Sequence, residues 1–182
     1  MRIISGRYKG KRLVAPKKLP VRPTTDMAKE GVFNILNNRY ELEDCSVLDL
    51  FSGTGNLSFE FGSRGAQSIT AVDAHKGCVQ FINKTTEELD LPIYTVKMDV
   101  FAYLQKCKNQ FDIIFSDPPY DLDDEKFFKI PDLVFKNGLL KKDGVLIVEH
   151  SPQTSLDARE NFQEKRKYGS SIFSFFGHNA EP

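Results

Sequence analysis

An acid, two prolines and a tyrosine stand at residues 117–120, just after the apolar run FDIIF. Proline cannot donate to a sheet ladder, so we expect a buried strand to end here, with Asp117, Pro118, Pro119 and Tyr120 as its rigid exit. This set suits methyl transfer to the exocyclic amine of a nucleobase, because the Asp117 carboxylate and the Pro118 carbonyl would hold the amine hydrogens and turn the lone pair toward an electrophile. Tyr120 would stack on a base taken out of its helix.

A second group of residues, at the ends of three earlier strands, suits an adenosine-containing methyl donor. In DLFSGTGNL at residues 49–57, Gly53 and Gly55 let a ligand approach the backbone, and the helix that follows offers free N–H groups. Position 58 is serine, so the three-glycine dinucleotide fingerprint is incomplete. Asp73 would accept the ribose hydroxyls, and Asp99 or its neighbouring amide would read an adenine edge. Singly, either acid also suits a structural role, Asp73 as a solvated acid and Asp99 as a helix cap.

Strands and helices alternate along the chain in the order that a parallel sheet covered on both faces requires. Apolar runs predict strands at 45–51, 68–73, 93–99, 111–117 and 144–150. Helices are predicted from Thr25 or Asp26, from the glycine turn to about Arg64, through residues 78–89, around Phe101 and Leu104, and over 124–140. The segment FQEKRKYGSSIFSFF predicts an antiparallel hairpin around Gly169 that completes the sheet edge.

The first 22 residues differ from the rest of the chain in charge. They contain eight basic residues and no acid, whereas the remainder holds 17 basic and 25 acidic residues. RIIS and KRLVA, separated by GRYKG, predict a β-hairpin, and KKLPVRP reads as an extended linker. A basic arm on an acidic body indicates an anionic partner, although a solvated terminal extension explains the charge equally well.

Composition bounds the class of protein. With 182 residues, 40% hydrophobic and 27% charged, the chain is typical of one globular domain with a small appendage. No apolar run approaches the ~20 residues of a membrane span, and the N-terminus lacks a signal-peptide core. Three widely spaced cysteines suit neither a disulfide framework nor a zinc site. We therefore expect a cytoplasmic protein without a metal.

On these residues the chain resembles the class I S-adenosylmethionine-dependent methyltransferases, in which a glycine turn after strand one precedes an N/D-P-P-Y/F motif after strand four. More narrowly, it resembles the bacterial 16S rRNA guanine-N2 methyltransferases of the RsmD family. The segments RIISGRYKGKRL, RPTTDMAKEGVFNIL, DLFSGTGNLSFEFGSRGA, DPPY and KYGSSIFSFF each have a counterpart in order. Two departures are Asn56, where small residues are usual, and His75, where an acid is often found.

The resemblance implies a doubly wound, Rossmann-like α/β sheet of seven strands, the last one antiparallel, with a small N-terminal β-hairpin extension. Residues 1–22 would form the basic arm and linker, and residues 23–182 the methyltransferase domain. The implied reaction transfers a methyl group from S-adenosylmethionine to N2 of one guanine of 16S rRNA, in the small ribosomal subunit or its assembly intermediate. A monomer is expected.

The expected site residues fall into three sets. The catalytic set is the DPPY motif itself. The cofactor set comprises Asp49, Phe51, Gly53, Thr54, Gly55, Asp73, Asp99 and Val100. The RNA-binding set comprises Arg7, Tyr8, Lys9, Lys11, Arg12 and Arg22. Within that set Tyr8 is expected to stack on RNA and Arg22 to lie near the active-site mouth, and a linker salt bridge explains Arg22 equally well.

Three other functions use the same motifs. A DNA adenine-N6 methyltransferase shares the D-P-P-Y chemistry, but such enzymes generally carry a further target-recognition region, for which 182 residues leave little room. A protein-glutamine methyltransferase usually has asparagine in place of Asp117. A non-enzymatic RNA-binding scaffold is disfavoured by the intact glycine turn and DPPY motif.

Overall fold

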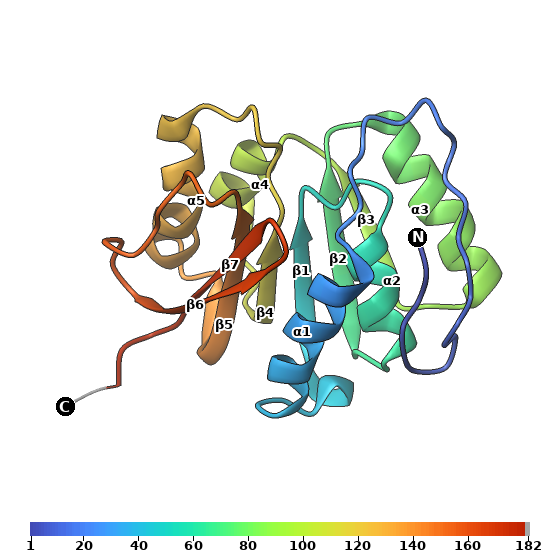
Figure 1. Cartoon of the computed structure of the whole chain (residues 1–182), viewed down its shortest axis with the longest axis horizontal. Helices are drawn as coiled ribbons and strands as arrows, with labels where there is room; N and C mark the ends of the chain where they lie inside the picture. The colour runs from blue at the N-terminus through green and yellow to red at the C-terminus, as the bar shows by residue number, and fades with distance from the viewer. Residues whose placement is uncertain (181–182) are drawn as a thin grey trace.

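The computed structural model describes residues 1–180 as a single sheet with helices on both faces (Figure 1). Its helices are α1 (Asp26–Asn37), α2 (Asn56–Ser63), α3 (Lys76–Leu89), α4 (Val100–Lys106) and α5 (Asp124–Lys136), with a 3-10 turn at Leu42–Asp44. Its strands are β1 (Ser46–Leu50), β2 (Ser68–Asp73), β3 (Ile93–Lys97), β4 (Phe111–Ser116), β5 (Leu140–His150), β6 (Phe162–Tyr168) and β7 (Ser171–Phe176). None of these helices is long and apolar enough to span a bilayer.

The strand order is β3-β2-β1-β4-β5-β7-β6, and β1 to β5 run parallel. Strand β7 pairs antiparallel with both β5 and β6. The expected seven-stranded, doubly wound sheet with an antiparallel last strand is therefore confirmed. The order reverses between β1 and β4, so the crevice at their carboxyl ends is where such a sheet binds ligands.

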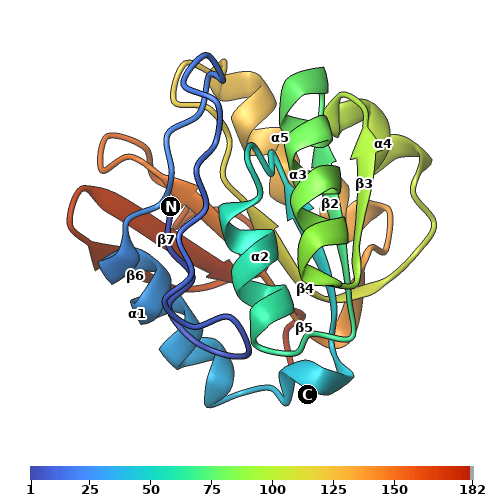
Figure 2. The ribbon, with the colours of Figure 1, turned by 90° about the vertical axis from the view of Figure 1, so that its right-hand side faces the viewer.

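Each central strand contributes alternate side chains to two hydrophobic cores. Val47, Ile113 and Ile147 pack with α1, α2 and α3, whereas their neighbours in the chain face α4 and α5. Figures 1 and 2 show these two groups of helices on opposite faces of the sheet. Both faces are thus covered, and only the strand ends remain to form a site.

Most predicted elements lie close to their expected positions, but the fifth helix ends early. The sequence predicted helix over residues 124–140, whereas α5 ends at Lys136 and β5 begins at Leu140. Gly138 has a φ of +64°, and the Gly138 N–H donates to the Phe135 carbonyl, which closes the helix. Strand β5 is correspondingly four residues longer at its start than expected.

The N-terminal hairpin is not found as two strands. Residues 1–25 contain one isolated antiparallel bridge, between Arg2 and Arg12, and otherwise form a loop that lies along α2 and α3 (Figure 2). Backbone hydrogen bonds do join residues 1–3 to residues 10–13, for example from the Ile3 N–H to the Lys11 carbonyl, but the pairing stops there because the next N–H groups bind α2. Ile4 and Ser5 donate to the Glu60 carboxylate at 2.9 and 3.1 Å.

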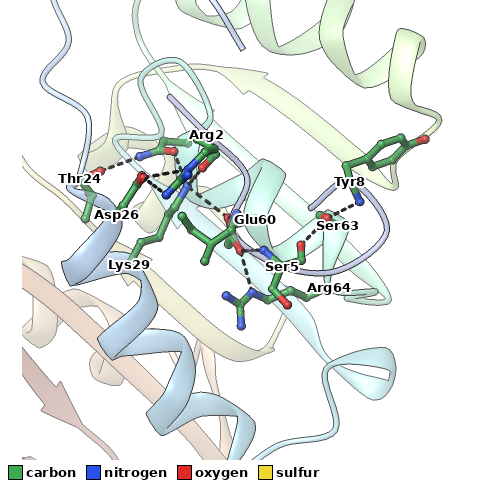
Figure 3. Close-up of polar contacts among 11 residues, drawn as sticks. Arg2, Ser5, Tyr8, Thr24, Asp26, Lys29, Glu60, Ser63 and Arg64 are labelled. Atoms are coloured by element: carbon green, nitrogen blue, oxygen red, sulfur yellow. Dashed lines mark hydrogen bonds and ion pairs between the residues drawn. The ribbon is translucent and has the colours of Figure 1, made fainter. Parts of the chain in front are cut away.

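A buried ion pair fastens the arm to the two helices beneath it (Figure 3). Lys29 on α1 and Glu60 on α2 are both fully buried, with 3.2 Å between the Lys29 Nζ and a Glu60 carboxylate oxygen. The Lys29 ammonium also donates to the Arg2 carbonyl at 2.5 Å, and Arg64 donates to Glu60 at 2.8 Å. Because both charges are satisfied by several partners, this network defines where the arm lies.

Candidate active site

Two adjoining cavities open at the carboxyl edge of the sheet. The first, about 400 Å³, lies over the glycine turn and the ends of β2 and β3, and the second, about 600 Å³, lies beside the DPPY motif and the β6–β7 turn. Linker residues 20–24 line the first cavity, and most of them line the second as well. Asp117, Pro119 and Arg22 line both, so they stand at the junction.

The glycine turn contains backbone conformations with positive φ, which glycine adopts without strain. Gly53 and Gly55 have φ values of +55° and +83°, in the left-handed region that favours glycine. A Cβ on Gly55 would lie 2.9 Å from side-chain atoms of both Ile82 and Phe59, so the helix could not pack there with a larger residue. Phe51 also has a positive φ, +56°, a strained conformation for a side chain of this size.

Asp73 ends β2 and holds the glycine turn. Its two carboxylate oxygens accept from the backbone N–H groups of Gly53 and His75, both at 2.8 Å. Each oxygen keeps further acceptor capacity, and Asp73 lines the first cavity. The arrangement therefore fits the ribose-binding role expected of this acid.

Asp99 and Val100 also line the first cavity, at the beginning of α4. The Asp99 carboxylate caps this helix by accepting from the Ala102 N–H at 3.0 Å. The helix-capping role considered for Asp99 is therefore present, and it coexists with a position in the cavity wall. Thr54, from the glycine turn, is buried in the same wall.

The two departures from the family pattern have structural roles. The Nδ1 atom of His75 accepts from the backbone N–H groups of Gly77 and Cys78, so this imidazole caps α3. The Asn56 amide donates to the Thr24 carbonyl at 3.1 Å and accepts from Lys29 at 2.9 Å. Asn56 thereby joins the first residue of α2 to the linker and to the buried ion pair.

One polar atom of the glycine turn has no partner within the described residues 1–180. The Ser52 hydroxyl is buried and unpaired, and Ser52 lines the first cavity. A buried hydroxyl without a hydrogen bond is costly, so a polar ligand in this cavity would offer the missing partner. Together with the free acceptors of Asp73, this fits a nucleoside-containing cofactor.

Asp49 is a buried acid on β1 beneath the first cavity. Burial raises the pKa of its carboxyl group to about 7, and the nearby Asp73 acts in the same direction. The Ser58 hydroxyl opposes this shift by donating to the Asp49 carboxylate at 2.6 Å. A cationic ligand in the cavity would favour the ionised form of Asp49.

Asp117 follows the last residue of β4, and its N–H donates to the Leu50 carbonyl at the end of β1. Burial raises the pKa of the Asp117 carboxyl well above its usual range, with further contributions from Glu149 and Asp49. The chemistry expected of Asp117 needs an ionised carboxylate, and the raised pKa acts against ionisation in the ligand-free protein. The Arg22 guanidinium acts in the opposite direction.

Arg22 and Tyr120 face each other at the mouth of the second cavity. The Arg22 guanidinium carbon lies 5.0 Å from the centre of the Tyr120 ring, within range of a cation–π contact. Tyr120 is 49% exposed, so part of its ring remains open. No ion pair of Arg22 is found among residues 1–180, so the structure does not give it the alternative role of a linker salt bridge.

Glu149 is a site residue that the sequence reasoning missed. It lies near the end of β5, is only 4% exposed, and lines the second cavity. Its carboxylate accepts from the Thr24 hydroxyl at 3.2 Å. The available signal was an acid near the end of the predicted strand GVLIVEH, in the strand next to the one that carries Asp117.

The other residues of the expected RNA-binding set do not lie at this site. Arg7 and Tyr8 bind through their backbone N–H groups to Ser63, the last residue of α2, at the opposite end of that helix from the glycine turn, about 12 Å along its axis. Tyr8 is half-buried, and its hydroxyl donates to the Leu89 carbonyl at 2.5 Å. This position anchors the arm, so the expected stacking of Tyr8 on RNA gains no support.

The exposed cations of the arm border a third cavity, of about 580 Å³, between the arm and α3. Lys11, Arg12 and Lys18 line it from the arm, and Lys84 lines it from the helix. Lys9 is also exposed, near the start of this stretch. A basic groove thus leads along α3 toward Gly77 and the linker, whose residues 20–24 line the first cavity.

The chain is similar to known proteins over nearly its whole length. The family model described as Conserved hypothetical protein 95 matches residues 1–177. Ribosomal RNA small subunit methyltransferase D of Buchnera aphidicola is 32% identical over 150 residues, which cover 82% of this chain and 75% of that protein.

Two solved structures share the fold. A putative methyltransferase from Escherichia coli has a TM-score of 0.86 at 25% identity, with 100% of this chain and 99% of that chain covered. A 16S rRNA N2 methyltransferase of Thermus thermophilus, in complex with AdoMet and guanosine, has a TM-score of 0.70 at 22% identity, covering 88% of this chain and 45% of that one. The second likeness concerns the fold alone. The family match over residues 1–177 and the sequence identity to curated relatives show the family as well. The chain belongs to the Conserved hypothetical protein 95 family, which is the RsmD family of methyltransferases.

Proposed function

We propose that this protein transfers the methyl group of S-adenosylmethionine to the N2 amine of one guanine in 16S rRNA. As a member of its family it is an S-adenosylmethionine-dependent rRNA methyltransferase. The observation that carries the finer proposal is the position of Asp117, at the junction of two cavities. One cavity fits a nucleoside-containing donor, and the other is large enough for a planar base.

The residues of the first cavity would hold the cofactor. Asp73 would accept the ribose hydroxyls, and the backbone of Gly53 and Gly55 would lie against the ligand. Asp49 and Thr54 would line the turn, with Phe51 and Val100 against the adenosine and Asp99 beside the adenine edge. Bound S-adenosylmethionine supplies an electrophilic methyl group and a positive charge. That charge would favour ionised Asp49 and Asp117, whose pKa values are raised without it.

The DPPY motif would activate the amine. The Asp117 carboxylate and the Pro118 carbonyl would each accept one N2–H, which frees the nitrogen lone pair to attack the methyl carbon. Pro118 and Pro119 limit the backbone, so both acceptors are fixed before the substrate arrives. Tyr120 would stack on the guanine ring. After the N–C bond forms, the amine nitrogen releases one proton, which Asp117 is placed to accept.

We propose a ribosomal substrate, the small subunit or its assembly intermediate, met in the bacterial cytoplasm by a monomer. Residues 1–22 would contact phosphates through Arg7, Lys9, Lys11 and Arg12, while residues 23–182 carry out the transfer. The third cavity supports separate roles for the arm and the domain, because cations of the arm lie beside one another along α3 there.

Transfer of labelled methyl groups from S-adenosylmethionine tests the proposal. The purified protein is incubated with unmodified small subunits, naked 16S rRNA and duplex DNA, and the digested products are identified by chromatography. N2-methylguanosine from the subunits is the expected product. N6-methyladenine from DNA would establish the adenine alternative instead. An Asp117→Ala variant that still methylates subunits fully would contradict the proposed role of the DPPY motif.

A further inference from the structure

The second cavity contains a buried carboxylate that the proposed chemistry does not use. Asp117 and Pro118 already provide the two acceptors that the N2 amine needs. Glu149 lines the same cavity from β5, the neighbouring strand, and is 4% exposed. Burying a carboxylate is costly unless hydrogen-bond donors surround it. The described residues provide Glu149 with only some of the donors that it can bind.

Glu149 is held by a chain of hydrogen bonds. It accepts from the buried Thr24 hydroxyl at 3.2 Å, while the Thr24 carbonyl accepts from Asn56. Asn56 in turn accepts from Lys29, which is fixed by the ion pair with Glu60 that Figure 3 shows. The carboxylate is therefore oriented by a rigid part of the molecule, as recognition of one base requires.

The Glu149 carboxylate has acceptor capacity left for a ligand. An ionised carboxylate offers about four lone-pair sites, and the Thr24 hydroxyl uses one of them. Ser171 and Arg22 line the same cavity, and both favour the ionised form. The remaining sites suit a hydrogen-bond donor on a base whose amine is held by Asp117.

Guanine presents such a donor next to its reactive amine. Its N1–H lies beside the N2 amine, so one edge of the base offers hydrogen-bond donors on two neighbouring nitrogen atoms, both bonded to C2. Adenine instead has an unprotonated N1, an acceptor, beside its N6 amine. An ionised carboxylate placed against N1 would accept from guanine and would be left unpaired against adenine.

We propose that Glu149 is the residue that selects guanine, by accepting the N1–H while Asp117 and Pro118 hold the N2 amine. This inference rests on the proposed function and adds the physical basis for choosing guanine over adenine. Burial raises the pKa of Glu149, whereas the Ser171 and Thr24 hydroxyls and Arg22 lower it. Asp117 and the exposed Asp121 are the other acids that line the cavity. Because only the ionised carboxylate rejects an N1 acceptor, the preference for guanine should increase as the pH rises.

The test replaces the target guanine by 2,6-diaminopurine. The modified base is introduced on a synthetic RNA segment, which is joined into 16S rRNA and assembled into small subunits. This base keeps the N2 amine but has an unprotonated N1. The wild-type protein should methylate the guanine subunits with a kcat/KM about 10- to 100-fold higher than that for the substituted subunits. In Glu149→Gln, the amide is able to donate to N1, so the ratio should fall to about 1 or reverse.

The matched control is Glu160→Gln, an exposed acid outside the cavities, which should keep the wild-type ratio. If the wild-type protein methylates the guanine subunits and the diaminopurine subunits equally well, that result alone overturns the proposal. An unchanged ratio in Glu149→Gln would overturn it as well. The proposed function fails separately, if the wild-type protein produces no N2-methylguanosine from the guanine subunits.

Discussion

At the scale of single residues, the site is defined by acids at neighbouring strand ends. Strand-end position was enough to predict Asp73, Asp99 and Asp117 from the sequence. Glu149 was missed because hydropathy does not distinguish a buried acid facing a cavity from an exposed one at the end of a strand. Ser58 had counted against a dinucleotide fold, and its hydrogen bond to Asp49 explains why a hydroxyl occupies that position.

The raised pKa of Asp117 predicts how activity depends on pH. Protonation replaces the charged acceptor by a weaker, neutral one, so kcat/KM should rise with pH. Burial moves the midpoint above the usual range of an aspartic acid, and the positive charge of the bound cofactor acts in the opposite direction. Asp117 and Glu149 interact, so the midpoint belongs to the pair. In Asp117→Asn the amide oxygen still accepts but does not titrate. The rise should therefore move to lower pH, where Glu149 alone ionises, and the maximum rate should fall roughly 10- to 100-fold.

Initial rates between pH 5.5 and 9 test this prediction, with saturating S-adenosylmethionine. Asp143→Asn is the matched control, because Asp143 is an exposed aspartate that lines neither cavity of the site. Its pH profile should coincide with that of the wild type. An unshifted midpoint in Asp117→Asn would mean that another group limits the rate.

At the scale of elements, the arm shows where sequence patterns were insufficient. RIIS and KRLVA have the composition of paired strands, but their backbone pairing is limited to residues 1–3 and 10–13, around a single bridge. The competing interaction comes from Glu60 and Ser63, which are distant in sequence and bind the backbone of the arm. A local pattern cannot reveal such partners, whereas the alternating strands and helices of the main sheet follow from local periodicity alone.

Two glycines of the arm provide a matched pair for testing its contact with α2. Gly6 and Gly10 have almost the same φ, +85° and +84°, so alanine strains both equally, by about 1 kcal/mol. A Cβ on Gly6 would lie 1.9 Å from the Ser63 carbonyl oxygen, whereas a Cβ on Gly10 would meet nothing within 4 Å. Gly6→Ala should therefore lower the free energy of unfolding by roughly 1–3 kcal/mol more than Gly10→Ala. Equal urea midpoints for the two variants would show that the arm is not held against α2.

The buried ion pair under the arm predicts a second stability difference. Lys29→Met removes the ammonium that Glu60 and the Arg2 carbonyl share, and it leaves a buried carboxylate with Arg64 as its remaining cation. The free energy of unfolding should fall by about 3 kcal/mol in urea titrations. Arg2→Ala, the control, breaks an ion pair with Asp26 whose partners are about half exposed, and it should cost less than about 1 kcal/mol. A similar loss in both variants would contradict the difference in burial.

At the scale of the whole molecule, charge is divided between the arm and the body. The chain has no net charge, yet its first 22 residues carry eight cations and no acid. The structure lays this arm beside α3, and Arg2 is its one cation with an ion-pair partner within residues 1–180. The arm ends in the linker that lines both cavities of the site. A phosphate backbone bound along the arm would thus lead to the DPPY motif.

This arrangement predicts a salt-dependent contribution of the arm to binding. Combining Lys11→Ala, Arg12→Ala and Lys18→Ala removes three cations of the groove without touching the cofactor cavity. If each contacts a phosphate, the slope of log Kd for small subunits against log salt concentration should fall by about 2–3. The KM for S-adenosylmethionine should stay unchanged, because these side chains do not line its cavity.

The matched control is a triple variant on the opposite face of the sheet, Lys106→Ala, Lys108→Ala and Lys136→Ala, which removes the same charge from exposed positions around α4 and α5. The control should leave the salt slope within about 1 of the wild type, since net charge acts only weakly across the molecule at physiological ionic strength. An equal fall in slope for both triple variants would mean that net charge, and not the path of the arm, governs binding. A fall confined to the arm variant would assign the phosphate contacts to the groove along α3, and with it the direction from which the RNA reaches Asp117.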